Sequence, residues 1–207
     1  MTMTALAPAR KQYGFTMMEV LITMLIILIG LLGIAALQTR AQMAELESYQ
    51  RAQALLLMSD IVDRINLNRE TVSCFRITTD TANGTPFIGA SGTGHLGTPT
   101  CSASSAAYNT QAINTLDDLD LLLQGSAETV GGVSVGAMIG ARACISYDAA
   151  TELGSPAKAG TGLYTIAVSW QAMSDLTTPT DNCADGLYGA ETKRRTVSST
   201  MRIADLY

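Results

Sequence analysis

Hydrophobic residues form one nearly uninterrupted run near the N-terminus of this chain. The 23 residues from Phe15 to Leu37 carry a single charge, which belongs to Glu19. A helix needs about 20 apolar residues to cross the hydrocarbon core of a bilayer. We therefore predict a membrane-spanning helix here. The run is too long for the apolar region of a secretory signal peptide, and no A-x-A-like cleavage site follows it.

After Leu37 the apolar residues are sparser, but they recur at steps of three and four, as on one face of a helix. This stripe contains one polar position and consists of Met43, Leu46, Gln50, Ala54, Leu57, Ile61 and Ile65. The helix is therefore expected to run from Phe15 to about Asn68, which is roughly 80 Å at 1.5 Å per residue. That length suits a first half in lipid and a second half that supports a folded head.

Small and charged residues modify this helix. Gly30 and Gly33 form a notch, and each glycine weakens a helix interior by about 0.5–1 kcal/mol relative to alanine. The notch either permits close helix approach or local unwinding in an assembly, or it is simply tolerated in lipid. On the outer side of the second half we expect acid-first ion pairs at i, i+4, namely Glu47 with Arg51 and Asp60 with Arg64.

Beyond Arg69 the pattern changes to short strands and turns. Three segments carry alternating or β-forming residues, namely 141–147, 162–170 and 195–203. The Gly- and Pro-containing segment 154–162 should join the first two as a hairpin. Thr115 to Gln124 is predicted to be a short threonine-capped helix. The segments 80–110 and 174–191 are predicted to be loops. An antiparallel sheet packed on the second half of the long helix would give an α+β architecture.

The composition indicates an aliphatic core and an acidic surface. Apolar residues make up 47% of the chain but aromatic residues only 5%, and the net charge is −5. If Met1 to Gly14 were removed, the chain would retain 11 basic and 18 acidic residues, which gives a net charge of −7. An acidic chain without basic clusters argues against nucleic-acid binding. The one basic run, Lys193 to Arg195, lies in a predicted strand and is expected on an exposed face.

The four cysteines all follow the apolar run, and no two of them have CxxC spacing. Behind a membrane-crossing segment, two structural disulfides in an oxidising compartment are the simplest interpretation. Three pairings are open. We prefer Cys74–Cys101 with Cys144–Cys183, because sequential pairs close short loops. Zinc is disfavoured because the chain has a single histidine.

The head offers no supported catalytic residue, cofactor or metal site. Gly92 to Gly97 matches G-x-G-x-x-G, but no strand precedes it and Pro99 blocks a following helix, so it is predicted to be a loop with His95 solvated in it. Oxygen ligands for calcium are a weaker alternative in the late loop, because their spacing lacks an EF-hand pattern: Asp175, Asp181, Asn182 and Asp185.

Glu19 is the informative exception in the apolar run. A charged side chain at the centre of a spanning helix costs roughly 2.5–3.5 kcal/mol on insertion scales, so it suggests a function. A cut between Gly14 and Phe15 would create a positive α-amino group. That group could pair with Glu19 of the same chain or of a neighbouring chain. Such a pair would fix the axial offset between packed helices.

The segment Lys11 to Leu21 resembles the prepilin processing motif, Gly-Phe-Thr-x-x-Glu followed by an apolar helix, and so resembles the type IV pilin superfamily. The resemblance implies cleavage after Gly14 by the prepilin peptidase on the cytoplasmic side. It also implies N-methylation of Phe15, retention of the helix in the inner membrane until assembly, and a pilin-like fold.

A finer resemblance is to the PilV-type minor pilins, the type IV pilus modification proteins. It is carried by 29–38, by Asp60 to Arg69 with its D-R-M-x-x-N-R-like end, and by Leu163 to Trp170 with its Y-x-I-x-V-x-W pattern. It implies a minor pilin that initiates pilus assembly and joins the tip complex without catalysis. The implied partners are other minor pilins, the major pilin, the prepilin peptidase, a tip adhesin and the inner-membrane assembly platform.

The expected organisation has four parts: a leader at 1–14, the membrane and assembly half of the helix at 15–38, its amphipathic half at 39–69, and a periplasmic head at 70–207. The chain would be a single-pass inner-membrane protein before assembly and part of the pilus, at its tip, afterwards. Two alternatives stay open. One is a pseudopilin of a type II secretion system, and the other is a membrane-anchored periplasmic enzyme or binding module.

Overall fold

A computed structural model of the chain describes residues 14–126, 129–134, 138–154 and 156–203. The chain forms two compact units, Met1–Ala44 and Glu45–Tyr207. The predicted leader lies outside the described residues apart from Gly14. The second unit is called the head below.

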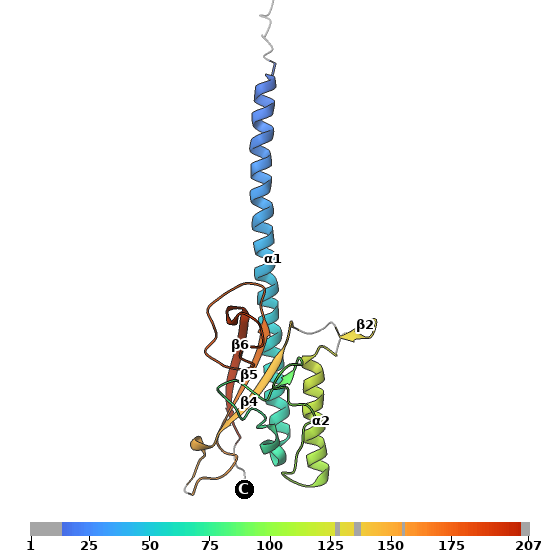
Figure 1. Ribbon diagram of the computed structural model, residues 1–207, viewed down its shortest axis with the longest axis vertical. Coiled ribbons are helices and arrows are strands. Elements are labelled where there is room, and N and C mark those ends of the chain that lie inside the picture. The colour runs from blue at the N-terminus through green and yellow to red at the C-terminus, as the bar shows by residue number, and fades with distance from the viewer. Residues whose placement is uncertain (1–13, 127–128, 135–137, 155, 204–207) are drawn as a thin grey trace, which may run out of the picture. The chain divides into compact units, whose positions relative to one another are not determined.

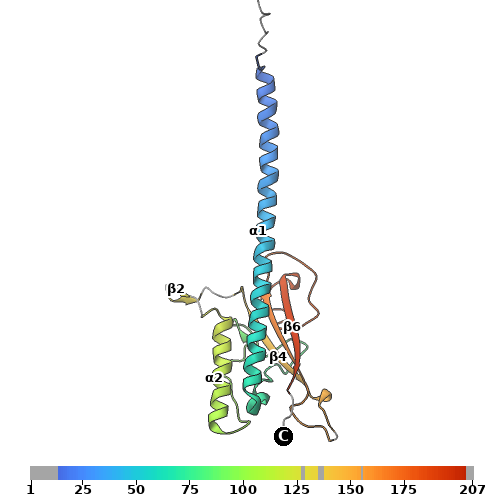
Figure 2. The same cartoon turned by 180° about the vertical axis from the view of Figure 1, so that it is seen from behind.

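The long helix α1 (Met17–Leu67) has 51 residues, and its bounds agree with the predicted ones to within two residues at each end. The side chain of Thr16 starts it, because its Oγ1 accepts a hydrogen bond from the backbone N–H of Glu19 at 3.3 Å. This is the threonine half of a capping box. No proline interrupts the helix. Figures 1 and 2 show the second half of α1 within the head.

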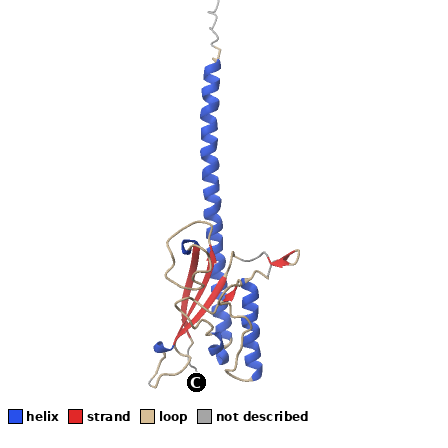
Figure 3. Cartoon of the chain, in the orientation of Figure 1, coloured by secondary structure: helices blue, strands red, loops and turns tan. Residues whose placement is uncertain are grey.

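The head contains an antiparallel four-stranded sheet in the order β1-β4-β5-β6. Its strands are β1 (Ile88–Gly89), β4 (Arg142–Asp148), β5 (Leu163–Gln171) and β6 (Arg194–Arg202). The three long strands match the predicted segments to within one residue at each end, and β4 and β5 form the expected hairpin. A separate small hairpin joins β2 (Thr129–Val130) to β3 (Val133–Ser134). Figure 3 shows the long strands of the four-stranded sheet beside the second half of α1. The α+β prediction is confirmed.

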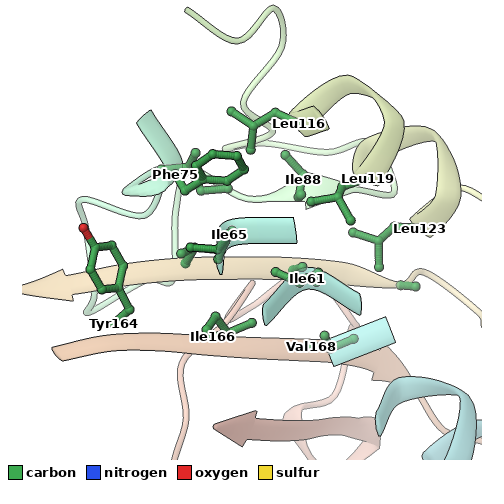
Figure 4. Packing of buried hydrophobic residues seen from close by; sticks show 14 of the residues in the cluster. Ile61, Ile65, Phe75, Ile88, Leu116, Leu119, Leu123, Tyr164, Ile166 and Val168 are labelled. Atoms are coloured by element: carbon green, nitrogen blue, oxygen red, sulfur yellow. The ribbon is translucent and has the colours of Figure 1, made fainter. Parts of the chain in front are cut away.

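The core of the head lies where α1 meets the sheet and a second helix, α2 (Ala106–Leu123). Alternate residues of β5 point to one face, as the strand period requires, and this face packs on Ile61 and Ile65 of α1. Figure 4 shows these two isoleucines between the side chains from β5 and those from α2. The labelled partners are Tyr164, Ile166, Val168, Leu116, Leu119 and Leu123.

The apolar stripe of α1 is buried only in its later part. Ala54, Ile61 and Ile65 are fully buried, but Met43 and Leu46 are about half exposed. The period of a hydrophobic pattern identifies one face of a helix. It does not show how far along that face the head extends.

Helix α2 is longer than predicted. It begins at Ala106 rather than at Thr115, because the Oγ of Ser105 accepts a hydrogen bond from the N–H of Tyr108 and caps the helix. The hydroxyl of Thr115 instead donates to the carbonyl of Gln111 within the helix, at 2.8 Å. A threonine that satisfies itself in this way need not mark a helix start. The predicted loop 80–110 is correspondingly shorter.

Two disulfides cross-link the head, Cys74–Cys101 and Cys144–Cys183, which is the pairing preferred from the sequence. The first joins the 3₁₀ helix η1 (Arg69–Phe75) to the segment before α2, and the second joins β4 to the loop before β6. The cysteines are 27 and 39 residues apart in the chain. In the chain-entropy model, closing such loops stabilises the fold by about 3.5–4 kcal/mol each.

Candidate functional site

The N-terminal part of α1 presents an apolar surface that no described residue of the chain covers. From Val20 to Leu37 the large apolar side chains are 46% to 71% exposed. The most apolar stretch of α1 is long enough to cross a membrane, and none of it is buried. So much contiguous apolar surface is unfavourable in water, and lipid or other apolar helices would satisfy it. This surface is the first element of the candidate site.

Polar side chains inside this apolar stretch are satisfied locally. The hydroxyl of Thr23 donates to the carbonyl of Val20 at 2.9 Å, and that of Thr39 donates to Ala35 at 3.1 Å. A hydroxyl bonded to its own helix loses little when water is removed. These threonines are therefore compatible with an apolar environment and need no partner from another helix.

Glu19 differs from these threonines. Its backbone N–H bonds to Thr16, but its carboxylate has no hydrogen bond or ion pair with any residue in the described part of the chain. Phe15 is 83% exposed and lies four positions before it, which is about one helical turn. The structure thus leaves an uncompensated acid at the start of the apolar surface.

Gly30 and Gly33 lie on the same exposed helix. A Cβ added at either position would meet no atom within 4 Å. Within this chain neither glycine is required for packing. Both interpretations of the notch, close approach of another helix and simple tolerance, therefore stay predictions.

In the head, α1 is held by an ion-pair cluster that the sequence did not reveal. The Nε of Arg195 on β6 donates to Oε1 of Glu47 at 2.9 Å, and the Oγ of Ser174 donates to Oε2 of Glu47 at 2.9 Å. Arg195 also donates to the carbonyl of Ser174 at 2.8 Å. The predicted partner of Glu47 was Arg51, and that prediction is wrong. A guanidinium fixed by several bonds is a better partner than a mobile arginine on the same helix.

The second predicted pair on the helix does form. The Nε of Arg64 donates to Oδ2 of Asp60 at 2.9 Å. Nearby, Nδ2 of Asn68 donates to the carbonyl of Arg64 at 2.8 Å, and Nε of Arg69 donates to the carbonyl of Asn66. The stretch that resembles the minor pilins therefore shapes the end of α1.

The basic run at 193–195 is not an exposed face as predicted, because Arg194 is only 1% exposed. Its guanidinium donates to the carboxylates of Glu191 and Asp185, and also to the backbone carbonyls of Asp181 and Cys183. Burial raises the pKa of Glu191, but the hydrogen bonds from Arg194, Gly186 and Asp185 together with the positive charge of Arg194 outweigh it, so the pKa of Glu191 is lowered. The alternation pattern marked a strand here but did not show that the loop before β6 folds over Arg194.

The segment 92–97 is a loop, as predicted, but His95 is not solvated. Its side chain is 22% exposed, and its Nε2 lies 2.8 Å from Oδ1 of Asp120 on α2. The N–H of Gly97 donates to its Nδ1 at 3.0 Å, so Nε2 carries the hydrogen that Asp120 accepts. Asp120 also accepts the N–H of Gly89. His95 therefore attaches the loop to α2.

The acids considered as calcium ligands have partners within the protein. Asp175 accepts a hydrogen bond from Thr192, Asp181 accepts one from the N–H of Cys183, and Asp185 pairs with Arg194. Among the described residues, no three histidine, cysteine or acidic side chains form a group that would hold a metal ion.

Arg142 is a further buried arginine with no signal in the sequence. Its guanidinium lies over the rings of Phe87 and Tyr188, at 5.3 and 4.9 Å from their centroids. It donates to three backbone carbonyls, those of Ala90, Ser91 and Gly140. Sequence analysis missed it because backbone acceptors leave no residue pattern.

Together these features define a pilin-like architecture, with a long N-terminal helix that is apolar in its first half and an antiparallel sheet packed on its second half. A family model for the prokaryotic N-terminal methylation motif matches residues 9–35, and a model described as type IV pilin Tt1218 matches residues 36–112. The chain belongs to the type IV pilin superfamily. No curated protein and no solved structure matches it.

Membership in this superfamily sets the general role of the chain. Pilins are structural proteins, and the methylation motif together with the apolar helix indicates membrane anchoring followed by incorporation into a pilus. The family also implies contacts with other pilins and with the prepilin peptidase.

Proposed function

We propose that this chain is a minor pilin of the PilV type, which takes part in initiating type IV pilus assembly and in the complex at the pilus tip. It acts through packing of α1 and through contacts of the head, not through catalysis. Its partners are other minor pilins, the major pilin, the prepilin peptidase, a tip adhesin and the inner-membrane assembly platform.

One observation carries this proposal. The long helix α1 begins two residues after Phe15; the large apolar side chains of its first half are exposed, and the single acid of that apolar run, Glu19, has no partner among the described residues. Cleavage after Gly14 would place a positive amino group about one turn from that carboxylate. A charge pair between neighbouring chains would then offset the cost of an acid in an apolar bundle.

Two segments support the finer assignment. In the stretch from Asp60 to Arg69, Arg64 donates to Asp60, and Asn68 donates to the carbonyl of Arg64 at the end of α1. The Y-x-I-x-V-x-W residues of β5 are all buried and belong to the core cluster that contains Ile61 and Ile65 of α1: Tyr164, Ile166, Val168 and Trp170. The four expected parts follow, with a leader at 1–14, an assembly half at 15–38, an amphipathic half at 39–69 and a periplasmic head at 70–207.

The test uses substitutions at the start of the helix. Gly14→Val should block processing, so that the leader is retained. Glu19→Gln should insert and be processed but should be strongly depleted from sheared filaments. Glu45→Gln is the matched control, because Glu45 is an exposed acid on the same helix outside the apolar run. Mass spectrometry of the filaments should report an N-methylated Phe15. Normal incorporation of both the Gly14 and the Glu19 variants would reject the proposal.

The pseudopilin alternative shares this N-terminal chemistry and differs in the phenotype. Deleting the gene should reduce the number of pili if the chain is a minor pilin, and should reduce protein secretion if it is a pseudopilin. A membrane-anchored binding module predicts that an unrelated anchor helix can replace 15–38 without loss of function. The assembly function predicts that this replacement abolishes incorporation.

A further inference from the structure

A groove of about 590 Å³ lies beside the Cys74–Cys101 disulfide in the head. One wall is the end of η1 with the residues that follow it, and the other wall is the segment 96–103. Leu116 of α2 contributes to the lining. Pockets of roughly 300–1,000 Å³ typically accommodate small molecules. The groove is therefore large enough for one or two sugar rings.

The lining of this groove is predominantly polar and carries one charge. The lining includes four residues that carry hydroxyl groups, Ser73, Thr98, Thr100 and Ser102, and the charge belongs to Arg76. None of the lining residues is acidic, although the chain as a whole has a net charge of −5. This sign of charge selects for an anion in a protein that otherwise repels anions.

Arg76 has unused hydrogen-bonding capacity. Its guanidinium lies over the ring of Tyr147, 4.5 Å from the centroid, and it makes no hydrogen bond or ion pair with any residue in the described part of the chain. A stacked guanidinium keeps its planar set of N–H donors free, and this set matches a carboxylate.

The ring of Tyr147, on which Arg76 stacks, is held in place by hydrogen bonds. The hydroxyl of Tyr147 donates to Oε1 of Glu152 at 2.5 Å and accepts the N–H groups of Gly160 and Gly162 at 2.9 and 3.0 Å. Glu152 also accepts the N–H of Gly160. Glu152 is thus engaged by Tyr147 and the backbone, and Arg76 is left for another anion.

The two walls are held together before any ligand arrives. The disulfide joins Cys74 on one wall to Cys101 on the other. At the far end of the segment, Oδ1 of Asn109 accepts the N–H groups of Ala103 and Ser104, at 3.0 and 2.9 Å. A groove with fixed walls loses little conformational entropy on binding, which favours affinity for a small polar ligand.

We propose that this groove binds a small carboxylate that also carries hydroxyl groups, that is, an acidic saccharide unit. Arg76 binds the carboxylate as a bidentate partner. The four hydroxyls, each of which both donates and accepts, bind the hydroxyl groups of the sugar. This assignment goes beyond pilus assembly, because it gives the head a ligand.

The experiment measures binding of D-galacturonate to the full mature chain in lipid nanodiscs by isothermal titration calorimetry and ligand-observed NMR. D-galactose is the matched neutral sugar, since it lacks only the carboxylate, and inorganic sulfate is the free oxyanion. Galacturonate should bind at least tenfold more tightly than either, because it alone uses both Arg76 and the hydroxyls. Equal binding of galactose or of sulfate would overturn the assignment, as would the absence of galacturonate binding.

Variants of the groove complete the test. Arg76→Gln should weaken galacturonate binding about tenfold or more. Arg69→Gln is the matched control, because Arg69 is an exposed arginine at the start of η1 and does not line the groove. Thr100→Val keeps the stack of Arg76 on Tyr147 and should weaken binding several-fold. Wild-type affinity in both groove variants, with unchanged thermal unfolding, would overturn the proposal.

Discussion

The Nε of Arg195 on β6 donates a hydrogen bond to Oε1 of Glu47 on α1, and the two residues are 148 positions apart in the sequence. This bond joins the edge strand of the sheet to α1 near the position where burial of the helix begins. Ser174 bonds to both residues and closes the cluster. The cluster therefore sets the position of the sheet along the helix.

The first prediction concerns this cluster. Glu47→Ala and Arg195→Ala should each lower the free energy of unfolding by about 1–2 kcal/mol, since the bond is charge-assisted and partly shielded from water. The double variant should lose less than the sum of the two single variants. Arg51→Ala is the control and should change stability by less than about 0.5 kcal/mol. Denaturant unfolding of the mature protein in detergent measures all four, and additive losses would contradict the pairing.

The second prediction concerns the buried hydroxyl of Tyr164, which has no hydrogen-bond partner among the described residues. Replacing an unsatisfied buried polar group by an apolar one of the same shape is nearly neutral or stabilising. Tyr164→Phe should therefore change stability by less than about 0.5 kcal/mol, whereas Tyr164→Ala should cost about 3–5 kcal/mol. A large loss in the phenylalanine variant would show that the hydroxyl has a partner.

The same tyrosine predicts a dependence on alkaline pH. Burial, more than any nearby charge, raises the pKa of Tyr164 to about 12. In the unfolded chain a tyrosine loses its proton near pH 10. The unfolded state therefore ionises first, and the free energy of unfolding should fall between about pH 10 and pH 12 while staying unaffected by this group below pH 10. Tyr164→Phe should show a shallower fall. Equal slopes in the two proteins would refute the assignment.

The third prediction uses two glycines with similar backbone angles. Gly84 and Gly97 have φ values of +60° and +68°. A Cβ on Gly84 would lie 2.0 Å from the carbonyl oxygen of Asn182, whereas a Cβ on Gly97 would meet nothing within 4 Å. Gly97→Ala should cost about 1 kcal/mol through backbone strain alone. Gly84→Ala should cost at least about 3 kcal/mol, because the loop next to Cys183 must also move. Thermal unfolding compares the two, and similar losses would contradict this packing.

The fourth prediction concerns the disulfides. Replacing both cysteines of either pair by serine should lower the free energy of unfolding by about 2–4 kcal/mol, and the Cys144–Cys183 pair should cost slightly more because it closes the longer loop. Unfolding of the two double variants under identical conditions tests this. If neither pair affected stability, the cross-links would not constrain the unfolded chain.

The features that the sequence predicted well are local. The ends of α1 and the three long strands follow from hydrophobic period and β-propensity, which act over a few neighbouring residues. The start of α2 was predicted wrongly because both Ser105 and Thr115 are good capping residues. Ala112, which precedes Thr115, is buried in the core of the head, and its burial depends on contacts with other elements. Local signals alone do not choose between two caps.

The features that escaped prediction depend on long-range contacts. Arg194 is buried because acids and carbonyls of the loop before β6 surround it, and His95 is ordered because α2 supplies Asp120. Glu47 pairs with Arg195 of β6 instead of with Arg51 of its own helix. The groove at Arg76 likewise needs η1, the segment after His95 and Tyr147 to come together. The spacing of residues in the sequence does not predict these long-range contacts.

Both disulfides lie in the head, and all four cysteines follow the apolar run in the sequence. The proposed cleavage after Gly14 would act at the start of the chain, so it would not depend on a finished head. The head itself matures only where thiols are oxidised. Protein made in a reducing cytosol should therefore lack both cross-links and be prone to proteolysis. Transfer of the head to an oxidising compartment would then be the step that gives it its full stability.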